Sequence, residues 1–250
     1  MSCGSAISPT AKFYRRFGAC VVRAHAYRNR VREAFRDAEH PMRRLLLALA
    51  LAIAATSARA DMIALTGTPG APPEHFEFTR TGSGAPGKWA IVDDATAEAG
   101  RALEQTSAEK TDYRFPLAIY QPLSAKDVEV SLRFKPMAGS VDRSGGIAVR
   151  LKDADNYYVV RANALEDNVR FYHVVKGRRT QVKSANVKVP ANEWHTLALK
   201  AEGDRFTISF DGKQLYTVTD KTLTNEGKIA LWTKADSITR FDRLDIRPLR

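Results

Sequence analysis

Strict alternation of apolar and polar side chains is the feature that most limits what this chain can fold into. Between residues 127 and 134 every second side chain is apolar: Val128, Val130, Leu132 and Phe134. Residues 205–211 repeat the pattern with Phe206, Ile208 and Phe210. Successive side chains of a strand point to opposite faces, so a period of two is typical of strands with one buried and one solvated face. The pair Asp211-Gly212 favours a two-residue hairpin, because both central positions of that turn adopt positive φ.

Similar short runs recur along the chain, with turn-forming residues between them. We expect further strands at residues 76–78, 88–92, 102–106, 117–120, 146–151, 157–163, 169–175, 194–200, 214–219, 228–233 and 240–246. No segment combines a sustained helical period with capping residues. The pattern therefore predicts an all-β fold, an antiparallel β-sandwich or jelly roll.

The first 60 residues have the features of a leader rather than of a folded domain. A short basic start, Met42-Arg43-Arg44, precedes an apolar run at residues 45–55 and the small-residue stretch Ala58-Arg59-Ala60. This layout is typical of a secretory signal peptide, at residues 42–60, that is cleaved before Asp61. The apolar run is shorter than the roughly 20 residues that a membrane-spanning helix needs, so we expect no membrane anchor. The sequence thus predicts an exported protein of periplasmic or extracellular location.

Three further segments complete the expected organisation. Residues 1–41 are rich in arginine and lack an apolar period, so we interpret them as disordered or as an extension upstream of a true start at Met42. Residues 61–87 form a Pro/Gly-rich arm. Residues 88–250 form the jelly-roll domain.

Most of the basic excess lies in the leader. The formal net charge is +11, yet residues up to Ala60 hold 11 Lys or Arg against 3 Asp or Glu, and the rest holds 28 against 25. This near balance argues against a nucleic-acid partner, and we interpret the basic run at 176–179 as the tip of a hairpin. Cys3 and Cys20 both precede the predicted cleavage point, which excludes a disulfide, a thiolate nucleophile or a Cys-based zinc site from the exported part.

Several motifs match the core of concanavalin A-like jelly rolls. In chain order they are Gly145-Gly146 with Arg150, Asp153 with Asn156-Tyr157-Tyr158, Asn192-Glu193-Trp194-His195, Phe210-Asp211-Gly212-Lys213, residues 227–233, and Phe241-Asp242. In that order they resemble the 3-keto-disaccharide hydrolase domain family and, more loosely, the laminin-G-like modules. The resemblance covers about residues 89–246. It implies a curved sheet whose concave face meets carbohydrate.

Polar side chains on otherwise apolar strands are the candidate ligand contacts. Such groups hydrogen-bond sugar hydroxyls, while an aromatic ring stacks on the C–H face of a sugar. We predict a saccharide site on the concave face, formed by Arg150, Tyr157, Arg161, Asn163, His173 and Trp232. The alternative is that the arginines pair with buried carboxylates or carbonyls. Tyr172 and His173 are adjacent on one strand, so only one of them faces the site, and Trp194 is expected in the core.

No carboxylates have an evident catalytic spacing. The E-x-D-x-x-E arrangement that the resemblance implies for related glucanases is absent. Glu166 and Asp167, expected in a loop, are the candidate acid or base, with Asp236 as a further rim carboxylate. The histidines of the exported part are too far apart in sequence for a metal motif, so we expect no metal and no cofactor. The turn at residues 153–156 offers oxygen ligands, and the resemblance is compatible with a structural calcium ion there.

These observations leave three functions open. A lectin-like, carbohydrate-binding module without turnover is favoured, because no carboxylate pair with catalytic spacing is visible. The alternative is a glycoside hydrolase acting on 3-keto-disaccharides or related glycosides, as the resemblance implies. The third is a structural or protein-interaction domain of the cell envelope. The oligomeric state is left open.

Overall fold

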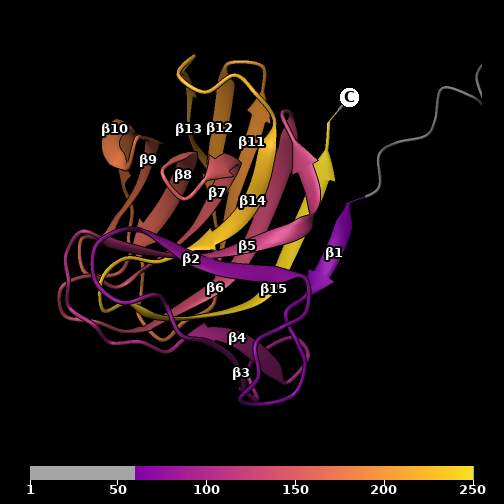
Figure 1. Ribbon diagram of the computed structural model, residues 1–250, viewed down its shortest axis with the longest axis vertical. Coiled ribbons are helices and arrows are strands. Elements are labelled where there is room, and N and C mark those ends of the chain that lie inside the picture. Colours follow the sequence, from indigo (N-terminus) through magenta and orange to yellow (C-terminus); the bar gives the residue numbers. More distant parts are fainter. Residues whose placement is uncertain (1–59, 250) are drawn as a thin grey trace, which may run out of the picture. The chain divides into compact units, whose positions relative to one another are not determined.

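The alternating runs form two antiparallel sheets that pack face to face, as Figure 1 shows for the computed structural model. The structure describes residues 60–249, and the predictions made for residues 1–59 lie outside them. Within the described residues the named strands pair antiparallel and no helix is present. The predicted all-β antiparallel sandwich is therefore confirmed.

Each sheet mixes strands that are distant in sequence. The eight-stranded sheet contains, in spatial order, β13 (Lys213–Thr219), β12 (Arg205–Phe210), β11 (His195–Glu202), β6 (Val128–Ala138), β15 (Ile238–Pro248), β4 (Arg101–Gln105) and β3 (Trp89–Asp93), with β1 (Asp61–Ala64) also paired to β15. The seven-stranded sheet contains β10 (Arg178–Asn186), β9 (Asn168–Val175), β8 (Asn156–Asn163), β7 (Ser144–Asp153), β14 (Gly227–Trp232), β5 (Arg114–Ala125) and β2 (Phe76–Gly82). In the described chain, no helix is long and apolar enough to cross a membrane.

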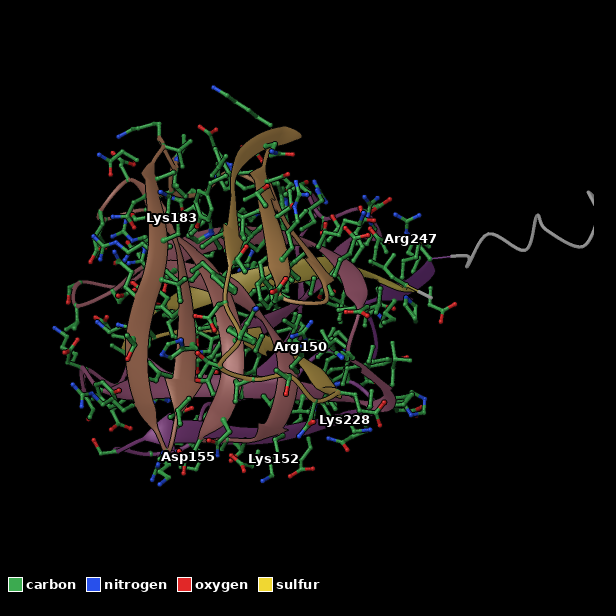
Figure 2. The ribbon with its side chains drawn as sticks, turned by 90° about the horizontal axis from the view of Figure 1, so that it is seen from above. Arg150, Lys152, Asp155, Lys183, Lys228 and Arg247 are labelled. Carbon is green, nitrogen blue, oxygen red and sulfur yellow. The ribbon has the colours of Figure 1, made fainter. Side chains whose placement is uncertain are left out.

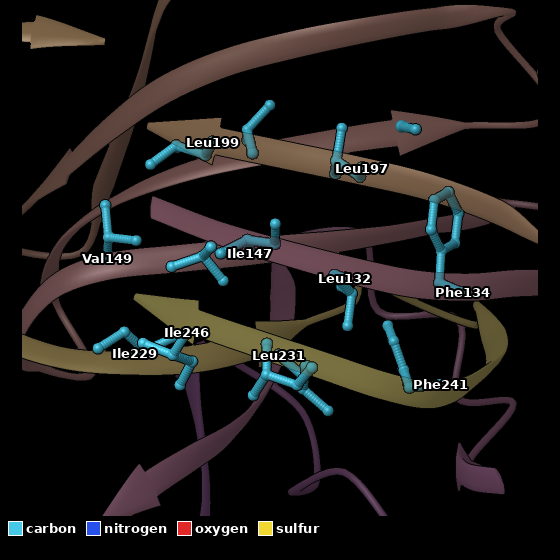
Figure 3. Close-up of a cluster of buried hydrophobic side chains, with 14 of the residues drawn as sticks. Leu132, Phe134, Ile147, Val149, Leu197, Leu199, Ile229, Leu231, Phe241 and Ile246 are labelled. Carbon is cyan, nitrogen blue, oxygen red and sulfur yellow. The ribbon is translucent and has the colours of Figure 1, made fainter. Parts of the chain in front are cut away.

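The space between the sheets is filled by the apolar faces that the alternation predicts. All six expected core residues of β6 and β12 are buried there: Val128, Val130, Leu132, Phe206, Ile208 and Phe210. Register places Leu132 opposite Leu197 of β11 and Phe134 opposite Phe241 of β15, and Figure 3 shows these side chains in the same layer. Burial of each such side chain contributes about 1.5–3 kcal/mol.

Two predicted hairpins are present with the expected backbone. Phe210 pairs with Lys213, and the residues between them, Asp211 and Gly212, have φ of 46° and 76°. At the tip of the β9–β10 hairpin, Lys176 and Gly177 have φ of 51° and 73°, as expected for the basic turn. By contrast, neither β1 nor β10 was predicted.

A second buried cluster lies on the outer face of the seven-stranded sheet, the face that points away from the other sheet. Its members are Phe115, Leu117, Ile119, Ala148, Leu151, Tyr157, Val159, Tyr172, Val174, Ala230 and Trp232. An outer face would ordinarily be wet. Here it is covered, because residues at one edge of the sheet contact residues of strands and turns toward the other edge.

Those contacts are hydrogen bonds between segments that are far apart in the strand order. Thr81 of β2 lies 2.7 Å from the Tyr157 hydroxyl and donates to the carbonyl of Ala154 in the β7–β8 turn. The Tyr113 hydroxyl, just before β5, donates to the Gly177 carbonyl at 3.0 Å in the β9–β10 turn. The sheet therefore curls across its outer face and encloses one end of it. We call this region, with Thr81, Phe115, Tyr157 and Trp232, the closed end.

Candidate functional site

The remaining part of the same outer face is polar. Register pairs Arg161 of β8 with Arg170 of β9, and Val159 with Tyr172, so these side chains share one face. The predicted common face of Tyr157, Arg161 and Asn163 is confirmed by the same register. We call the group formed by Arg161, Glu166, Asn168, Arg170 and Tyr172 the polar end.

Arg161 is the buried anchor of the polar end, with a side chain only 2% exposed. Its Nη1 donates to the side-chain oxygen of Asn168, and its Nη2 lies 2.7 Å from Glu166 Oε2 and 3.4 Å from the Tyr172 hydroxyl. Its Nε is buried and has no hydrogen-bond partner within residues 60–249. Arg161 therefore positions its neighbours, and the structure pairs it with a carboxylate, the alternative that the sequence left open.

The carboxylate of Glu166 is held by the protein through one of its two oxygens, Oε2. Arg161 Nη2, Asn168 Nδ2 and Arg170 Nη1 all contact Oε2, at 2.7, 3.1 and 3.2 Å. Within the described residues no hydrogen bond reaches Oε1, and the side chain is 41% exposed. Partial burial alone would raise the pKa of Glu166, but Arg161, Asn168 and Arg170 outweigh it, so this pKa lies below its ordinary value. The group is thus an oriented, ionised acceptor.

The turn that carries Glu166 is fixed by Asn163. The Asn163 side-chain oxygen accepts from the backbone N–H of Leu165 at 2.7 Å and of Glu166 at 3.2 Å, while its nitrogen donates to Asp142 at 3.1 Å. Asn163 is 1% exposed. It therefore acts on the site through the position of Glu166 and not by an open contact of its own.

Asp167 does not form a pair with Glu166. Its φ is 50°, and its carboxylate turns toward the segment after β10, where it contacts Lys188 Nζ at 2.7 Å and accepts from the Val189 N–H at 3.0 Å. These hydrogen bonds hold the pKa of Asp167 below its ordinary value. Asp236, the further candidate, is likewise committed, because it accepts from the backbone N–H groups of residues 140–142.

Arg150 lies apart from Arg161, which corrects the expectation that the two arginines share a site. The pairing of β7 with β8 is irregular after Val149, and Arg150 has φ of 50°. Its guanidinium therefore turns to the end of the sandwich, where it donates to three carbonyls: those of Lys126, Gly203 and Leu223. It borders a cavity of about 350 Å³ that Asp204, Asp220 and Lys221 also line. Figure 2 shows Arg150 well separated from Lys183 on β10.

His173 is also not part of the polar end. It pairs with Tyr158, whose ring belongs to the core between the sheets, so it points to the opposite face from Tyr172. Its Nδ1 lies 3.3 Å from Asp220 Oδ2 and 3.3 Å from the Thr222 hydroxyl. Of the adjacent pair, Tyr172 is the residue that shares a face with Arg161.

Tyr157 and Trp232 lie on the predicted face but at its closed end, and both are fully buried. The Trp232 Nε1 donates to the Tyr157 hydroxyl at 3.3 Å, and the Trp232 ring stacks on Phe115 with centroids 5.3 Å apart. They form the floor of the enclosed cluster. Trp194, expected in the core, instead lies half-buried on the outer face of the eight-stranded sheet, with Arg133 and Lys135 over its ring.

The turn proposed for calcium is closed by its own hydrogen bonds. Asp153 Oδ1 accepts from the Asp155 N–H at 2.9 Å and from the Asn156 side chain at 2.8 Å. In residues 60–249 no group of three or more His, Cys, Asp or Glu is arranged to hold a metal ion. The structural calcium ion stays a prediction.

Sequence reasoning missed Arg170 and Arg179. The Arg179 guanidinium lies over the rings of Phe115, Tyr172 and Trp232, with Cζ 4.6, 4.5 and 5.7 Å from their centroids. Arg179 belongs to β10, and the sequence pattern assigns only its first two residues, as part of the run 176–179, to the tip of a basic hairpin. Had residues 178–186 been predicted as a strand paired with residues 168–175, Arg179 would have been placed on the same face as Arg161.

Comparison with known proteins gives a family and a fold. The model of the family described as the 3-keto-alpha-glucoside-1,2-lyase-like domain matches residues 74–247. A comparison with curated proteins gave no match. Among solved structures, the carbohydrate-binding module CBM66 from Bacillus subtilis is similar, with 22% identity, a TM-score of 0.55, and coverage of 70% of this chain and 97% of that one.

Two glycosidase-type structures are similar at lower identity. One is the GH16 protein of the Bacteroides ovatus mixed linkage glucan locus, with a TM-score of 0.54, 11% identity, and coverage of 74% of this chain and 99% of that one. The other is the Bacillus licheniformis beta-glucanase, with a TM-score of 0.51, 13% identity, and coverage of 76% and 98%. The chain thus shares its jelly-roll fold with a carbohydrate-binding module and with glycosidases.

Proposed function

This chain belongs to the 3-keto-alpha-glucoside-1,2-lyase-like domain family, and we propose that it binds a saccharide at the polar end of its seven-stranded sheet. The observation that carries the proposal is the orientation of Glu166. Three donors hold Oε2 of a side chain that is 41% exposed, so the carboxylate is fixed in place before any ligand arrives. An oriented, ionised acceptor suits sugar hydroxyls, which are donors, and costs little ordering on binding.

The neighbours of Glu166 supply the hydrogen-bond donors and the aromatic ring that such a site needs. Arg170 is 33% exposed and offers N–H donors beside the carboxylate, and Tyr172 provides the adjacent ring. Alternating donors and acceptors next to an aromatic ring match a sugar, which has vicinal hydroxyls around an apolar C–H face. The similar carbohydrate-binding module supports the same assignment at the level of the fold.

The binding test is calorimetry on the full chain with a 3-keto-disaccharide and with the same disaccharide before oxidation. Glu166→Gln removes the charge but keeps the size, and we expect it to weaken binding by at least about tenfold. Asp167→Asn is the matched control, because that carboxylate is adjacent but faces Lys188. Equal losses in the two variants, or no binding by the wild type, would refute the site.

A second function is cleavage of the glycosidic bond, and the uncommitted Oε1 of Glu166 favours it. A ketone at C3 acidifies the hydrogen on C2. If Oε1 takes that proton, the C2–H electron pair forms a C1–C2 double bond while the C1–O bond breaks, and the departing oxygen acquires a proton. Water addition to the product would give the net result of hydrolysis.

Turnover is tested with the same reagents. The full chain is incubated with the 3-keto-disaccharide, and the released monosaccharide is measured over time for the wild type, Glu166→Gln and Asp167→Asn. Loss of release in Glu166→Gln alone supports cleavage. Saccharide binding with no release by the wild type leaves the protein a binding module and refutes the enzyme.

Export belongs to the same proposal. The basic start, apolar run and small-residue stretch at residues 42–60 support a leader that is removed before Asp61. The test is the intact mass of the protein recovered from the medium or periplasm of expressing cells. A product that retains residues 45–55 would refute it.

A further inference from the structure

Three arginines and one carboxylate meet on the outer face of the seven-stranded sheet. Arg161 and Arg170 share Glu166, at 2.7 and 3.2 Å. Arg179 Cζ lies 4.5 Å from the centroid of the Tyr172 ring, the same ring whose hydroxyl is 3.4 Å from Arg161. Within residues 60–249 no Asp or Glu is within ion-pair distance of Arg179. The cluster therefore carries positive charge that the described chain does not neutralise.

Its guanidinium groups also keep unused donors in buried positions. Arg161 Nε, Arg170 Nε and Arg179 Nη1 are each shielded from solvent and have no hydrogen-bond partner among the described residues. A buried N–H without an acceptor destabilises the folded state, and the effect is larger when the group is charged. Three such donors on one face indicate that acceptors are missing there.

The position of Arg179 limits where a ligand can place the missing acceptor atoms. Its guanidinium lies on Phe115, Tyr172 and Trp232, at the border between the closed end and the polar end. The β10 register places Arg179 opposite Val174, on the face of Tyr172, while Arg178 points to the other side. A ligand that contacts both Glu166 and Arg179 must therefore extend along Tyr172, with hydroxyls at one end and acceptor oxygens at the other.

We infer that the saccharide bound at this site is acidic, and that its carboxylate pairs with Arg179. This inference rests on the proposed function and names the class of sugar. A carboxylate is planar and accepts two parallel N–H bonds from a guanidinium, so it fits the unused fork of Arg179. The aromatic rings beneath the guanidinium exclude water from one side of the pair, which strengthens it.

The test compares one saccharide in two charge states. The full chain is titrated at physiological ionic strength with a galacturonic acid oligosaccharide and with its methyl-esterified form. We expect the acid form to bind about tenfold more tightly, as one charge-assisted hydrogen-bonded pair provides. Arg179→Gln should abolish this preference, and Arg179→Lys should retain part of it. Arg178→Gln, one residue away and on the other face, should leave it unchanged.

The outcomes separate the two proposals. Equal binding of both forms overturns the acidic-sugar inference while saccharide binding stands. No binding of either form, nor of the disaccharides named above, counts against the proposed function itself. A preference that survives in Arg179→Gln, or is lost equally in Arg178→Gln, also overturns the inference. Displacement of the acid form by equimolar inorganic sulfate would make this a plain anion site and overturn the assignment to a sugar.

Discussion

The outer faces of both sheets carry several arginines, but they differ in how many carboxylate partners they provide for them. On the eight-stranded sheet, Lys135 and Arg240 lie 2.5 and 2.9 Å from Asp94, and Arg240 also contacts Glu104 at 2.6 Å. Arg133, Arg243 and Arg247 likewise each have a carboxylate partner. On the seven-stranded sheet, Arg161 and Arg170 share Glu166, and Arg179 has no ion-pair partner within residues 60–249. Figure 2 shows Arg247 and Lys183, from strands of the two different sheets, on opposite sides of the molecule.

This difference separates arginines that are paired within the fold from arginines that we propose to contact a ligand. A charge that is removed from water needs a partner, and on the eight-stranded sheet the protein supplies it. On the seven-stranded sheet the donors outnumber the acceptors. Arginines with their own carboxylate partners stabilise the fold on the eight-stranded sheet, and we propose that the arginines left with too few acceptors on the seven-stranded sheet contact a ligand.

The largest effect is expected on the paired face. Asp94→Asn leaves Lys135, with a side chain only 7% exposed, beside a neutral amide, and we expect a loss of about 3–5 kcal/mol in the free energy of unfolding. Urea unfolding measures it. The control is Asp93→Asn, whose partner Arg101 is 44% exposed and whose loss should stay below about 1 kcal/mol. A small loss in Asp94→Asn would remove the contrast between the faces.

Lowering the pH should reduce the free energy of unfolding, because it protonates the carboxylate of Asp94. Burial alone would raise the pKa of Asp94, but Lys135, Thr96 and Arg240 together hold it well below its ordinary value. Its stabilising contribution is therefore complete above the unfolded-state pKa of about 3.9 and is lost as the pH falls toward the lower folded-state pKa. The urea midpoint should drop from pH 6 to pH 3. Asp94→Asn should flatten that drop, and an unchanged slope would contradict the assignment.

The smallest effect is expected at the unpaired arginine. Arg179→Gln loses contacts with aromatic rings but breaks no ion pair, so the free energy of unfolding should change by less than about 1 kcal/mol. The same urea experiment decides it. A loss as large as that of Asp94→Asn would mean that Arg179 stabilises the fold and is not held for a ligand.

The sequence predicts the fold well because period-two alternation depends on local side-chain chemistry. β6 and β12 each have one apolar and one polar face, and both were found from that pattern. β10 was missed because it is an edge strand with mostly exposed or half-exposed residues on both faces, so no alternation marks it. Arg179 was missed with it.

Only part of the geometry of the candidate site follows from the sequence, because a common face says nothing about curvature or backbone irregularity. The period of β8 grouped Arg161 with Tyr157 and Asn163 correctly. It could not indicate that the sheet curls over Tyr157, which follows from contacts between Thr81 and Ala154, more than 70 positions apart. Nor could it indicate the positive φ that turns Arg150 away.

The most direct test of the account is to follow the arginine side chains by NMR while a saccharide binds. Each guanidinium gives its own Nε–Hε resonance, so both outer faces report in one titration of the full chain with a 3-keto-disaccharide and with the galacturonic acid oligosaccharide. The account predicts shifts of Arg161 and Arg170 with both sugars, a shift of Arg179 with the acidic sugar, and unchanged signals from Arg133 and Arg240. Shifts confined to Arg133 and Arg240, or binding with no shift of Arg161 and Arg170, would contradict it.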